Sequence, residues 1–214
     1  MRKIGIIVVL LSIVTFFLWP QIKMNAKIKK HFSEVKYENG DIIFQTSNSR
    51  QCEAVKMATH SDVSHCGILF QEEDKWFVLE AVEPVQIISL AEFIKRGTGQ
   101  HYTIKRLKQP AQLSSDEIAN MLTQGRKWVG KHYDIYFNWS GAELYCSELV
   151  WKLYHDQAKV DLCKLRPLRD YDLKNNLVGV MMKERYGDKV PYDELMVAPS
   201  DIFASEMLQV VESK

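Results

Sequence analysis

The sequence predicts an α+β fold in which a mostly antiparallel sheet packs against helices. Segments with strand character are concentrated in the first half of the chain, and segments with helical periodicity in the second half. Turn residues separate neighbouring strand segments, so consecutive strands can pair directly. Runs of strands followed by runs of helices are typical of α+β proteins, whereas a doubly wound parallel sheet needs the two to alternate along the chain.

Length and composition indicate a globular domain of ordinary make-up. The chain has 214 residues, of which 46% are hydrophobic and 26% charged, and these fractions allow a normal hydrophobic core. The formal net charge is +1, whereas nucleic-acid-binding proteins carry a clear basic excess, so we expect no nucleic-acid partner. The four cysteines show no C-x-x-C spacing, which favours free thiols with one reactive member over a disulfide framework.

An apolar run over residues 4–19, closed by Pro20, stands apart from the rest of the chain. Such a run after a basic start is typical of a secretory signal peptide or an uncleaved signal anchor. No small-x-small cleavage site follows it, which favours the anchor. We therefore assign residues 1–24 to a signal anchor or signal peptide and residues 25–214 to the folded domain. We expect a membrane-anchored or exported protein of the bacterial cell envelope or periplasm, although lysines after the run favour a cytoplasmic flank.

The strand segments of the first half are short runs rich in β-branched and aromatic residues, bounded by turn residues. Asn39-Gly40 is a turn signal directly before the first of them. The expected strands cover residues 41–44, 64–70, 75–81, 86–89 and 101–107. Residues 71–74 separate the second strand from the third, so we expect these two to form an antiparallel hairpin with a four-residue loop.

The helical segments are recognised by apolar periodicity and by capping residues. Gly130 and Gly187 are the expected stops of two of them. The expected helices cover residues 50–59, a segment from Ser114 or Ser115 to 129, a segment that begins near Cys146, residues 173–185, and a short segment that opens at Pro199.

Cys146 falls in the first turn of an expected helix, three and four residues before Leu149 and Val150, so it points toward the buried face. The positive end of the helix dipole favours the thiolate form of a cysteine placed there. The unpaired N–H groups of the same turn can hold a developing oxyanion. A nucleophile is one interpretation of this residue, and a small buried hydrophobic residue is the other.

His65 and Glu80 lie on the two strands of the expected hairpin. A four-residue loop pairs Phe70 with Lys75 and places Glu80 directly opposite His65, on the same face of the sheet. A carboxylate in that position can accept the imidazole N–H and fix its tautomer. A slip of one residue would put the two side chains on opposite faces. A strand histidine can equally be a hydrogen-bonded core or surface residue.

Several of these segments together resemble the YiiX-type branch of the NlpC-like cysteine hydrolases. This branch is circularly permuted relative to papain, because its histidine precedes its cysteine. The resemblance extends over residues 40–200. The segments that carry it are Gly40-Asp41-Ile42-Ile43-Phe44, Thr59-His60-Ser61-Asp62-Val63-Ser64-His65-Cys66-Gly67, Leu79-Glu80-Ala81-Val82, Gly130-Lys131-His132-Tyr133-Asp134 and Tyr145-Cys146-Ser147-Glu148-Leu149-Val150-Trp151.

The resemblance implies a papain-like, circularly permuted NlpC-type fold and a catalytic triad. By this likeness Cys146 is the nucleophile, His65 the base and Glu80 the residue that orients the base. Tyr145 and Ser147 flank the nucleophile and are candidate substrate-binding or oxyanion residues, with simple packing as the other interpretation of Tyr145.

The function that follows is hydrolysis of an amide bond through a thioester acyl-enzyme, with no cofactor. The expected substrates are a small peptide, a cell-wall fragment or a lipid-like amide, because the resemblance implies relatives that cut cell-wall peptides and more distant ones, such as lecithin retinol acyltransferase, that move acyl chains. Two alternatives stay open. One is a lipid acyltransferase or lipase with the same triad and a wide apolar groove beside the cysteine. The other is a non-catalytic lipid- or peptide-binding module.

Two rival chemistries are disfavoured by the same residues. His60, Asp62, His65 and Cys66 contain metal-ligating atoms, but no second cluster supplies a convincing further ligand, and adjacent strand residues point to opposite faces. We therefore expect no metal site. A serine-based triad is disfavoured because the chain lacks the G-x-S-x-G elbow.

Overall fold

The structure is a computed structural model that describes residues 37–109 and 111–214. One compact unit extends from Glu38 to Lys214. The apolar run over residues 4–19, where we expect a signal anchor, lies outside the described residues. Among the residues that are described, no helix has both the length and the apolar character needed to cross a membrane.

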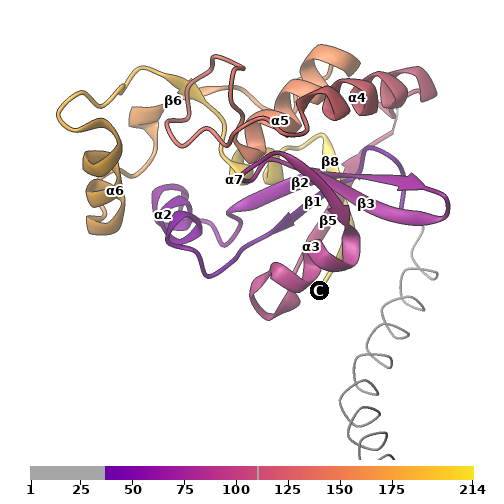
Figure 1. Cartoon of the computed structure of the whole chain (residues 1–214), viewed down its shortest axis with the longest axis horizontal. Coiled ribbons are helices and arrows are strands. Elements are labelled where there is room, and N and C mark those ends of the chain that lie inside the picture. The colour runs from indigo at the N-terminus through magenta and orange to yellow at the C-terminus, as the bar shows by residue number, and fades with distance from the viewer. Residues whose placement is uncertain (1–36, 110) are drawn as a thin grey trace, which may run out of the picture. The chain divides into compact units, whose positions relative to one another are not determined.

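A six-stranded sheet forms the centre of the unit, with strands in the order β4-β3-β2-β1-β5-β8 and antiparallel pairing between all neighbours (Figure 1). This arrangement confirms the α+β fold with a mostly antiparallel sheet. The strands are β1 (Ile42–Gln45), β2 (His65–Glu72), β3 (Lys75–Glu80), β4 (Gln86–Ser89), β5 (Thr103–Leu107) and β8 (Leu208–Ser213). A separate two-stranded ladder joins β6 (Arg166–Pro167) to β7 (Leu195–Met196).

The helices lie around this sheet, and one of them carries the candidate nucleophile at its first residue. They are α2 (Arg50–Thr59), α3 (Leu90–Arg96), α4 (Ser115–Trp128), α5 (Cys146–Lys152), α6 (Asn176–Tyr186) and α7 (Pro199–Phe203). Helix α5 continues into a π-helical turn over Leu153–Gln157. Short 3-10 turns occupy Thr98–Gln100 and Leu168–Asp170.

Helix α3 and strand β8 were not expected from the sequence. Helix α3 follows β4 without a loop, because Ser89 ends the strand and also caps the helix: its hydroxyl accepts from the Glu92 N–H while the Glu92 carboxylate accepts from the Ser89 N–H. Strand β8 completes the sheet edge beside β5, and its pairing depends on residues far apart in sequence.

The turn between β2 and β3 differs from the expected four-residue loop. Glu72 pairs with Lys75, so the loop has only the residues Glu73 and Asp74, both with positive φ (46° and 62°). Such a turn matches the twist of a hairpin, but its usual Asn-Gly or Asp-Gly signature is missing here. The expected register was therefore wrong by two residues. Because the side-chain period of a strand is two, the shift leaves Glu80 on the predicted face.

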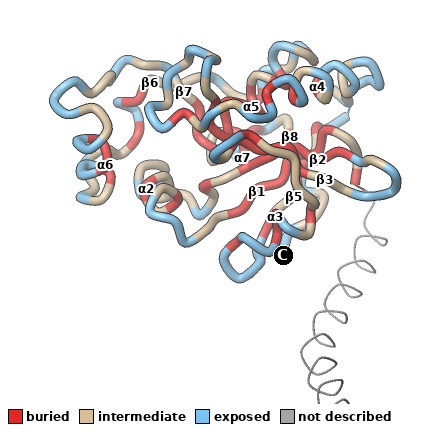
Figure 2. Tube along the Cα trace, in the orientation of Figure 1, coloured by how far each residue is buried: buried red, intermediate tan, exposed pale blue. Residues whose placement is uncertain are grey.

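The main hydrophobic core lies between the sheet and helix α5. Alternate residues of β1 and β2, such as Phe44, Cys66 and Ile68, pack against Leu149 and Val150 of α5, and all five are at most 2% exposed. Figure 2 shows this concentration of buried residues along the central strands. Helix α3 contacts β3 and β4. In Figure 1, α3 and α5 lie on opposite sides of the sheet.

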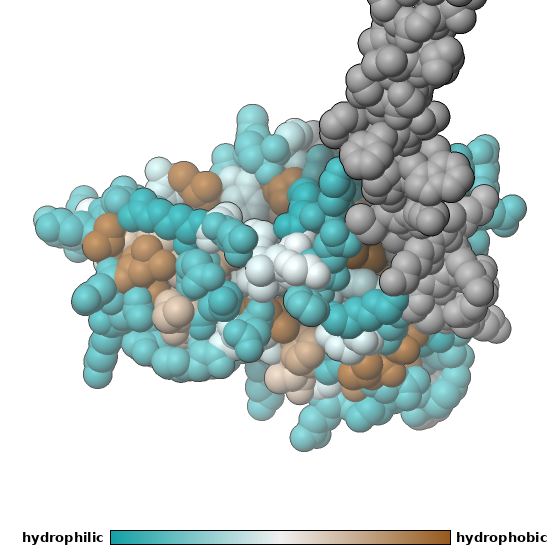
Figure 3. All heavy atoms as spheres, turned by 90° about the horizontal axis from the view of Figure 1, so that it is seen from below, coloured by the Kyte–Doolittle hydropathy of each residue, from teal (hydrophilic) through white to brown (hydrophobic). Residues whose placement is uncertain are grey.

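A smaller cluster joins α2 to α6. Its buried members are Ala54, Leu168, Val178, Met181 and Met182. The outer surface is different in character: on the face visible in Figure 3, hydrophilic side chains predominate and hydrophobic ones occur in small separate groups. The two internal clusters therefore hold α5, α2 and α6 in place. Among the described residues, the face visible in Figure 3 carries no large hydrophobic patch.

Candidate active site

Cys146 is the first residue of α5 and is only 4% exposed. Tyr145 precedes it with extended backbone (φ −103°, ψ 166°) and acts as the N-cap. The Leu149 N–H donates to the Tyr145 carbonyl at 3.0 Å as the first helical hydrogen bond. The N–H groups between these residues belong to the first turn, at the positive end of the helix. The thiol therefore lies where a negative charge is favoured.

His65 is the first residue of β2, at the end of the sheet that faces the Cys146 thiol. Its ring stacks on Phe93 of α3, with centroids 5.6 Å apart, and its side chain is 13% exposed. Its Nε2 lies 2.6 Å from Oε2 of Glu80. Since Nε2 is occupied by the carboxylate, Nδ1 is the nitrogen left for the hydrogen bond to Cys146. The structure thus brings the three predicted triad residues together.

Glu80 reaches His65 diagonally across the hairpin. In the observed register, which pairs Ile68 with Leu79, Glu80 stands opposite Gly67 rather than His65. A Cβ at Gly67 would lie 2.8 Å from the Leu79 carbonyl oxygen and 3.3 Å from the Glu80 Cβ. A side chain at position 67 would therefore crowd the main chain of β3 and the base of the Glu80 side chain. The glycine leaves the space through which Glu80 contacts the histidine.

Two further side chains hold the Glu80 carboxylate, which is completely buried. Gln86 of β4 donates its Nε2–H to Oε1 at 2.9 Å, and Arg96 at the end of α3 binds the same oxygen. A buried carboxylate without such partners would favour its protonated form. Burial alone would raise the Glu80 pKa, but the bonds to His65, Gln86 and Arg96 outweigh burial and lower it. Glu80 is therefore kept ionised.

The electrostatics of His65 and Cys146 favour an ion pair. Burial would lower the His65 pKa, but the hydrogen bond and charge of Cys146, and then those of Glu80, raise it to about 10. The Cys146 pKa is lowered well below the usual thiol value: a hydrogen bond from Cys66 contributes most, burial opposes it, and the His65 bond and charge follow. A thiolate beside an imidazolium is thus the favoured resting state.

Cys66 was missed as a contributor to the site. It is fully buried, and its thiol and its backbone N–H both donate to the Cys146 sulfur. Burial, and then this contact with the Cys146 thiolate, raise the Cys66 pKa, so Cys66 keeps its proton and acts as a donor. His65 and Cys66 point to opposite faces of β2, yet both reach Cys146, because the thiol lies at the end of the strand.

The predicted flanking residues Tyr145 and Ser147 both lie beside the thiol, but their hydroxyls bind the main chain of Val197. The Ser147 hydroxyl donates to the Val197 carbonyl at 2.8 Å, and the Tyr145 hydroxyl accepts from the Val197 N–H at 3.2 Å. These bonds connect α5 to the segment before α7. Both side chains therefore line the wall of the site, and their hydroxyl oxygens hold the main chain of Val197.

The residues weighed as metal ligands do not converge. His60 lies on the surface, with its Nε2 3.1 Å from Oδ2 of Asp172. His65 and Cys66 are engaged with Glu80 and Cys146. Across residues 37–109 and 111–214, no group of three or more His, Cys, Asp or Glu side chains is arranged to hold a metal ion.

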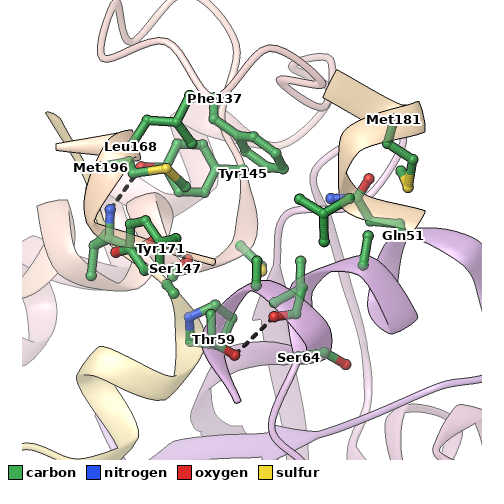
Figure 4. Close-up of a pocket in the computed structure, with 18 of the residues that line it drawn as sticks. Gln51, Thr59, Ser64, Phe137, Tyr145, Ser147, Leu168, Tyr171, Met181 and Met196 are labelled. Atoms are coloured by element: carbon green, nitrogen blue, oxygen red, sulfur yellow. Dashed lines mark hydrogen bonds between the residues drawn. The ribbon is translucent and has the colours of Figure 1, made fainter. Parts of the chain in front are cut away.

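A cavity of about 70 Å³ opens beside Cys146. It lies where the main core meets the α2–α6 cluster, and most of its lining is apolar. Figure 4 shows Phe137 and Tyr145 on one side, with Leu168 and Met196 near them, and Met181 on the other side. The thiol therefore borders a mostly apolar space.

Comparisons with known proteins agree with this arrangement. Residues 36–212 match the family model described as permuted papain-like amidase enzyme, YaeF/YiiX, C92 family. The chain is 36% identical over 174 residues to the uncharacterized protein YiiX of Escherichia coli strain K12, which covers 81% of this chain and 85% of that protein. The fold is similar to a crystal structure titled metalloprotein yiiX from Escherichia coli O157:H7. That similarity has a TM-score of 0.78 at 37% identity and covers 83% and 97% of the two chains.

Proposed function

This chain belongs to the permuted papain-like amidase family of YaeF/YiiX type, and we propose that it cleaves an amide bond with Cys146, His65 and Glu80 as its triad. Family membership makes it a cysteine hydrolase in general terms. The observation that supports the specific triad is the continuous hydrogen-bonded path from Arg96 through Glu80 and His65 to the Cys146 thiol.

The first half of the proposed reaction forms a thioester. The Cys146 thiolate attacks the carbonyl carbon, and the carbonyl oxygen becomes an oxyanion next to the first-turn N–H groups of α5. The intermediate collapses by breaking the C–N bond. Protonated His65 gives its proton to the leaving nitrogen, so a neutral amine departs and the acyl group stays on sulfur.

The second half returns the enzyme to its resting state. Neutral His65 takes a proton from water, and the resulting hydroxide equivalent attacks the thioester carbonyl. The C–S bond breaks, the acid product leaves, and the thiolate–imidazolium pair is restored. Glu80 accepts from the ring Nε2–H in both halves, which keeps Nδ1 toward the thiol and stabilises the charged ring.

No step of this proposal passes through a metal. The similar solved structure carries the word metalloprotein in its title. In the described part of this chain, however, the ligating side chains near the thiol are paired with one another, and no group of three or more is arranged around a common point. The residues present therefore do not fit a metal centre.

We also propose that the apolar run over residues 4–19 keeps this hydrolase at a membrane of the bacterial envelope. The support is its sequence alone: an apolar stretch without a cleavage signal. Fractionation of cells that express the full chain should place it with the membranes. A soluble full-length protein would reject the anchor, and a soluble protein with a new N-terminus beyond the run would show a cleaved signal peptide.

Replacement of the nucleophile tests the proposed function. Cys146→Ala removes the sulfur and leaves a residue with high helix propensity in the first turn, so the free energy of unfolding should change by at most ~1–2 kcal/mol. Turnover of any amide or ester substrate should vanish, because no other group can form the acyl-enzyme. The measurements are turnover and thermal melts of both proteins. A variant that melts normally and still turns over substrate at the wild-type rate would reject the thiol mechanism.

A further inference from the structure

We infer that the cavity beside Cys146 is an acyl subsite for a compact apolar group, about the size of a leucine or methionine side chain. The inference rests on the proposed function and adds to it a substrate class: amides whose acyl part carries a short, uncharged, apolar group near the carbonyl.

The lining of the cavity is mostly apolar on the two sides that α2 and α6 provide, with Gln51, Thr59 and Arg185 as the polar members. Helix α2 contributes Ala54 and Ala58, and helix α6 contributes Val178, Met181 and Met182. Of these, all but Ala58 are buried. Methionine side chains adapt their shape to an apolar partner, and small alanines on the facing helix leave the room for it.

Most of the polar side chains in the wall are already engaged within the protein. Thr59 donates to the Val55 carbonyl at 2.8 Å, and the Ser64 hydroxyl lies 2.7 Å from that of Thr46. Ser147 donates to the Val197 carbonyl, Tyr171 donates to an oxygen of Asp201 at 2.5 Å, and Gln51 accepts from Arg185. A polar substrate group would therefore lose its water and gain few matching partners.

The volume limits the size of the guest. The space beside the thiol has a volume of about 70 Å³, well below the roughly 300–1,000 Å³ of a pocket that holds a drug-sized ligand. That suits a branched or short linear apolar group. It excludes a long fatty acyl chain, and it differs from the wide apolar groove that a lipid acyltransferase would need.

A second, larger space adjoins the cavity and has a different lining. A groove of about 730 Å³ shares Ala58, Thr59, Tyr171 and Leu173 with the cavity wall. Its other lining residues are polar, aromatic or charged: His60, Arg166, Arg169, Asp170, Asp172, Lys174 and Tyr192. The groove is thus polar where the cavity is apolar, and the two spaces meet at the side of α2.

The chemistry of the acyl-enzyme assigns the cavity to the acyl half of the substrate. After the C–N bond breaks, the acyl group remains bonded to the Cys146 sulfur, which lines the cavity. The amine must leave and water must arrive before the thioester is cleaved. The narrow apolar cavity therefore suits the part that stays on the sulfur.

A series of acyl donors tests this assignment. The full-length protein is mixed with p-nitrophenyl esters of straight acyl groups from two to twelve carbons, and acylation of Cys146 is followed by intact mass and peptide mapping. We expect the rate to rise to an optimum near four to six carbons and to fall at least about tenfold by twelve. Ala58→Leu should move the optimum to shorter chains and Met181→Ala to longer ones. Val180→Ala, on the exposed side of α6, should leave it unchanged.

The outcomes separate this inference from the proposed function. Acylation of Cys146 at equal rates for all chain lengths, or an optimum that neither cavity variant moves, would overturn the acyl subsite and leave the thiol mechanism standing. Absence of acylation at Cys146 with every ester would overturn both. Thermal melts of the three variants show which are folded, and because the two cavity variants change the volume in opposite directions, either one alone suffices for the test.

Discussion

Two buried carboxylates near strand β1 each bind an arginine, but only one of them is connected to a reactive group. Asp41, directly before β1, accepts two hydrogen bonds from Arg106, at 2.6 and 2.7 Å. Glu80, at the end of β3, binds Arg96 and also the ring of His65, which pairs with Gln45 at the other end of β1. The Asp41–Arg106 pair connects β1 to β5, whereas Glu80 is connected through His65 to the thiol.

The difference is visible in the pKa shifts of the two carboxyls. Burial raises the Asp41 pKa above its ordinary value in spite of the Arg106 bonds. For Glu80, burial is outweighed by His65, Gln86 and Arg96, and the pKa is lowered. The carboxylate that supports a charged imidazole is therefore held in its ionised form, whereas the bonds around Asp41 do not outweigh its burial. Substitution of Asp41, Glu80 or Arg96 tests this contrast.

The largest expected effect comes from Glu80→Gln. The amide can still contact the ring, but it cannot stabilise an imidazolium by charge, and it can hold the wrong tautomer. Turnover should fall by at least about 100-fold, and the Cys146 pKa should rise because its cationic partner is weakened. Steady-state kinetics and alkylation of Cys146 as a function of pH measure the two effects. Unchanged kcat/KM would remove Glu80 from the triad.

A smaller effect is expected from Arg96→Gln, because Glu80 keeps its bonds to His65 and Gln86 and the Arg96 side chain is 42% exposed. Turnover should fall by about 3- to 10-fold without a large change in melting temperature. Arg126→Gln is the matched control: Arg126 pairs with Glu72 at the far end of β2, and both side chains are at least 40% exposed. Equal losses in the two variants would show that Arg96 has no special role.

The smallest effect on catalysis, and the largest on stability, is expected from Asp41→Asn. This change leaves the guanidinium of Arg106, whose side chain is only 16% exposed, without its main carboxylate, which should cost about 2–4 kcal/mol of unfolding free energy. Alkylation of Cys146 should proceed at the wild-type rate in the folded protein, because the change lies at the opposite end of β1. Denaturant unfolding and alkylation are the measurements. A slowed alkylation in fully folded protein would mean that the two ends are coupled.

Many helices and strands were predictable from the sequence, because their signals are local. The expected bounds of helix α2 and strand β4 match the structure, and helix α4 begins at the predicted Ser114 cap. The hairpin register was wrong by two residues, since a turn of Glu73 and Asp74 carries no glycine to mark it. Glu80 nevertheless lies beside His65, as expected, because a shift of two preserves the face.

The rest of the site depends on contacts that no local pattern reports. Arg96 reaches Glu80 because α3 packs beside β3 and β4, and α3 itself was not expected. Cys66 binds Cys146 because the end of β2 meets the start of α5, a contact between residues 80 positions apart in sequence. The contacts of Arg96 and Cys66 with the site depend on tertiary packing. A sequence pattern can therefore suggest Cys146, His65 and Glu80 without showing which residues support them.

The central claim is that Cys146 rests as a thiolate beside protonated His65, and the pH dependence of its alkylation tests this most directly. Because the Cys146 pKa is lowered and the His65 pKa is raised to about 10, the ion pair is present across neutral pH and is lost below the first value and above the second. Cys163 is the internal control, since burial raises its pKa to about 12. With iodoacetamide and peptide mapping from pH 6 to 9, the Cys146 rate should stay nearly constant while the Cys163 rate rises about tenfold per pH unit. A Cys146 rate that rises in parallel with that of Cys163 would contradict the account.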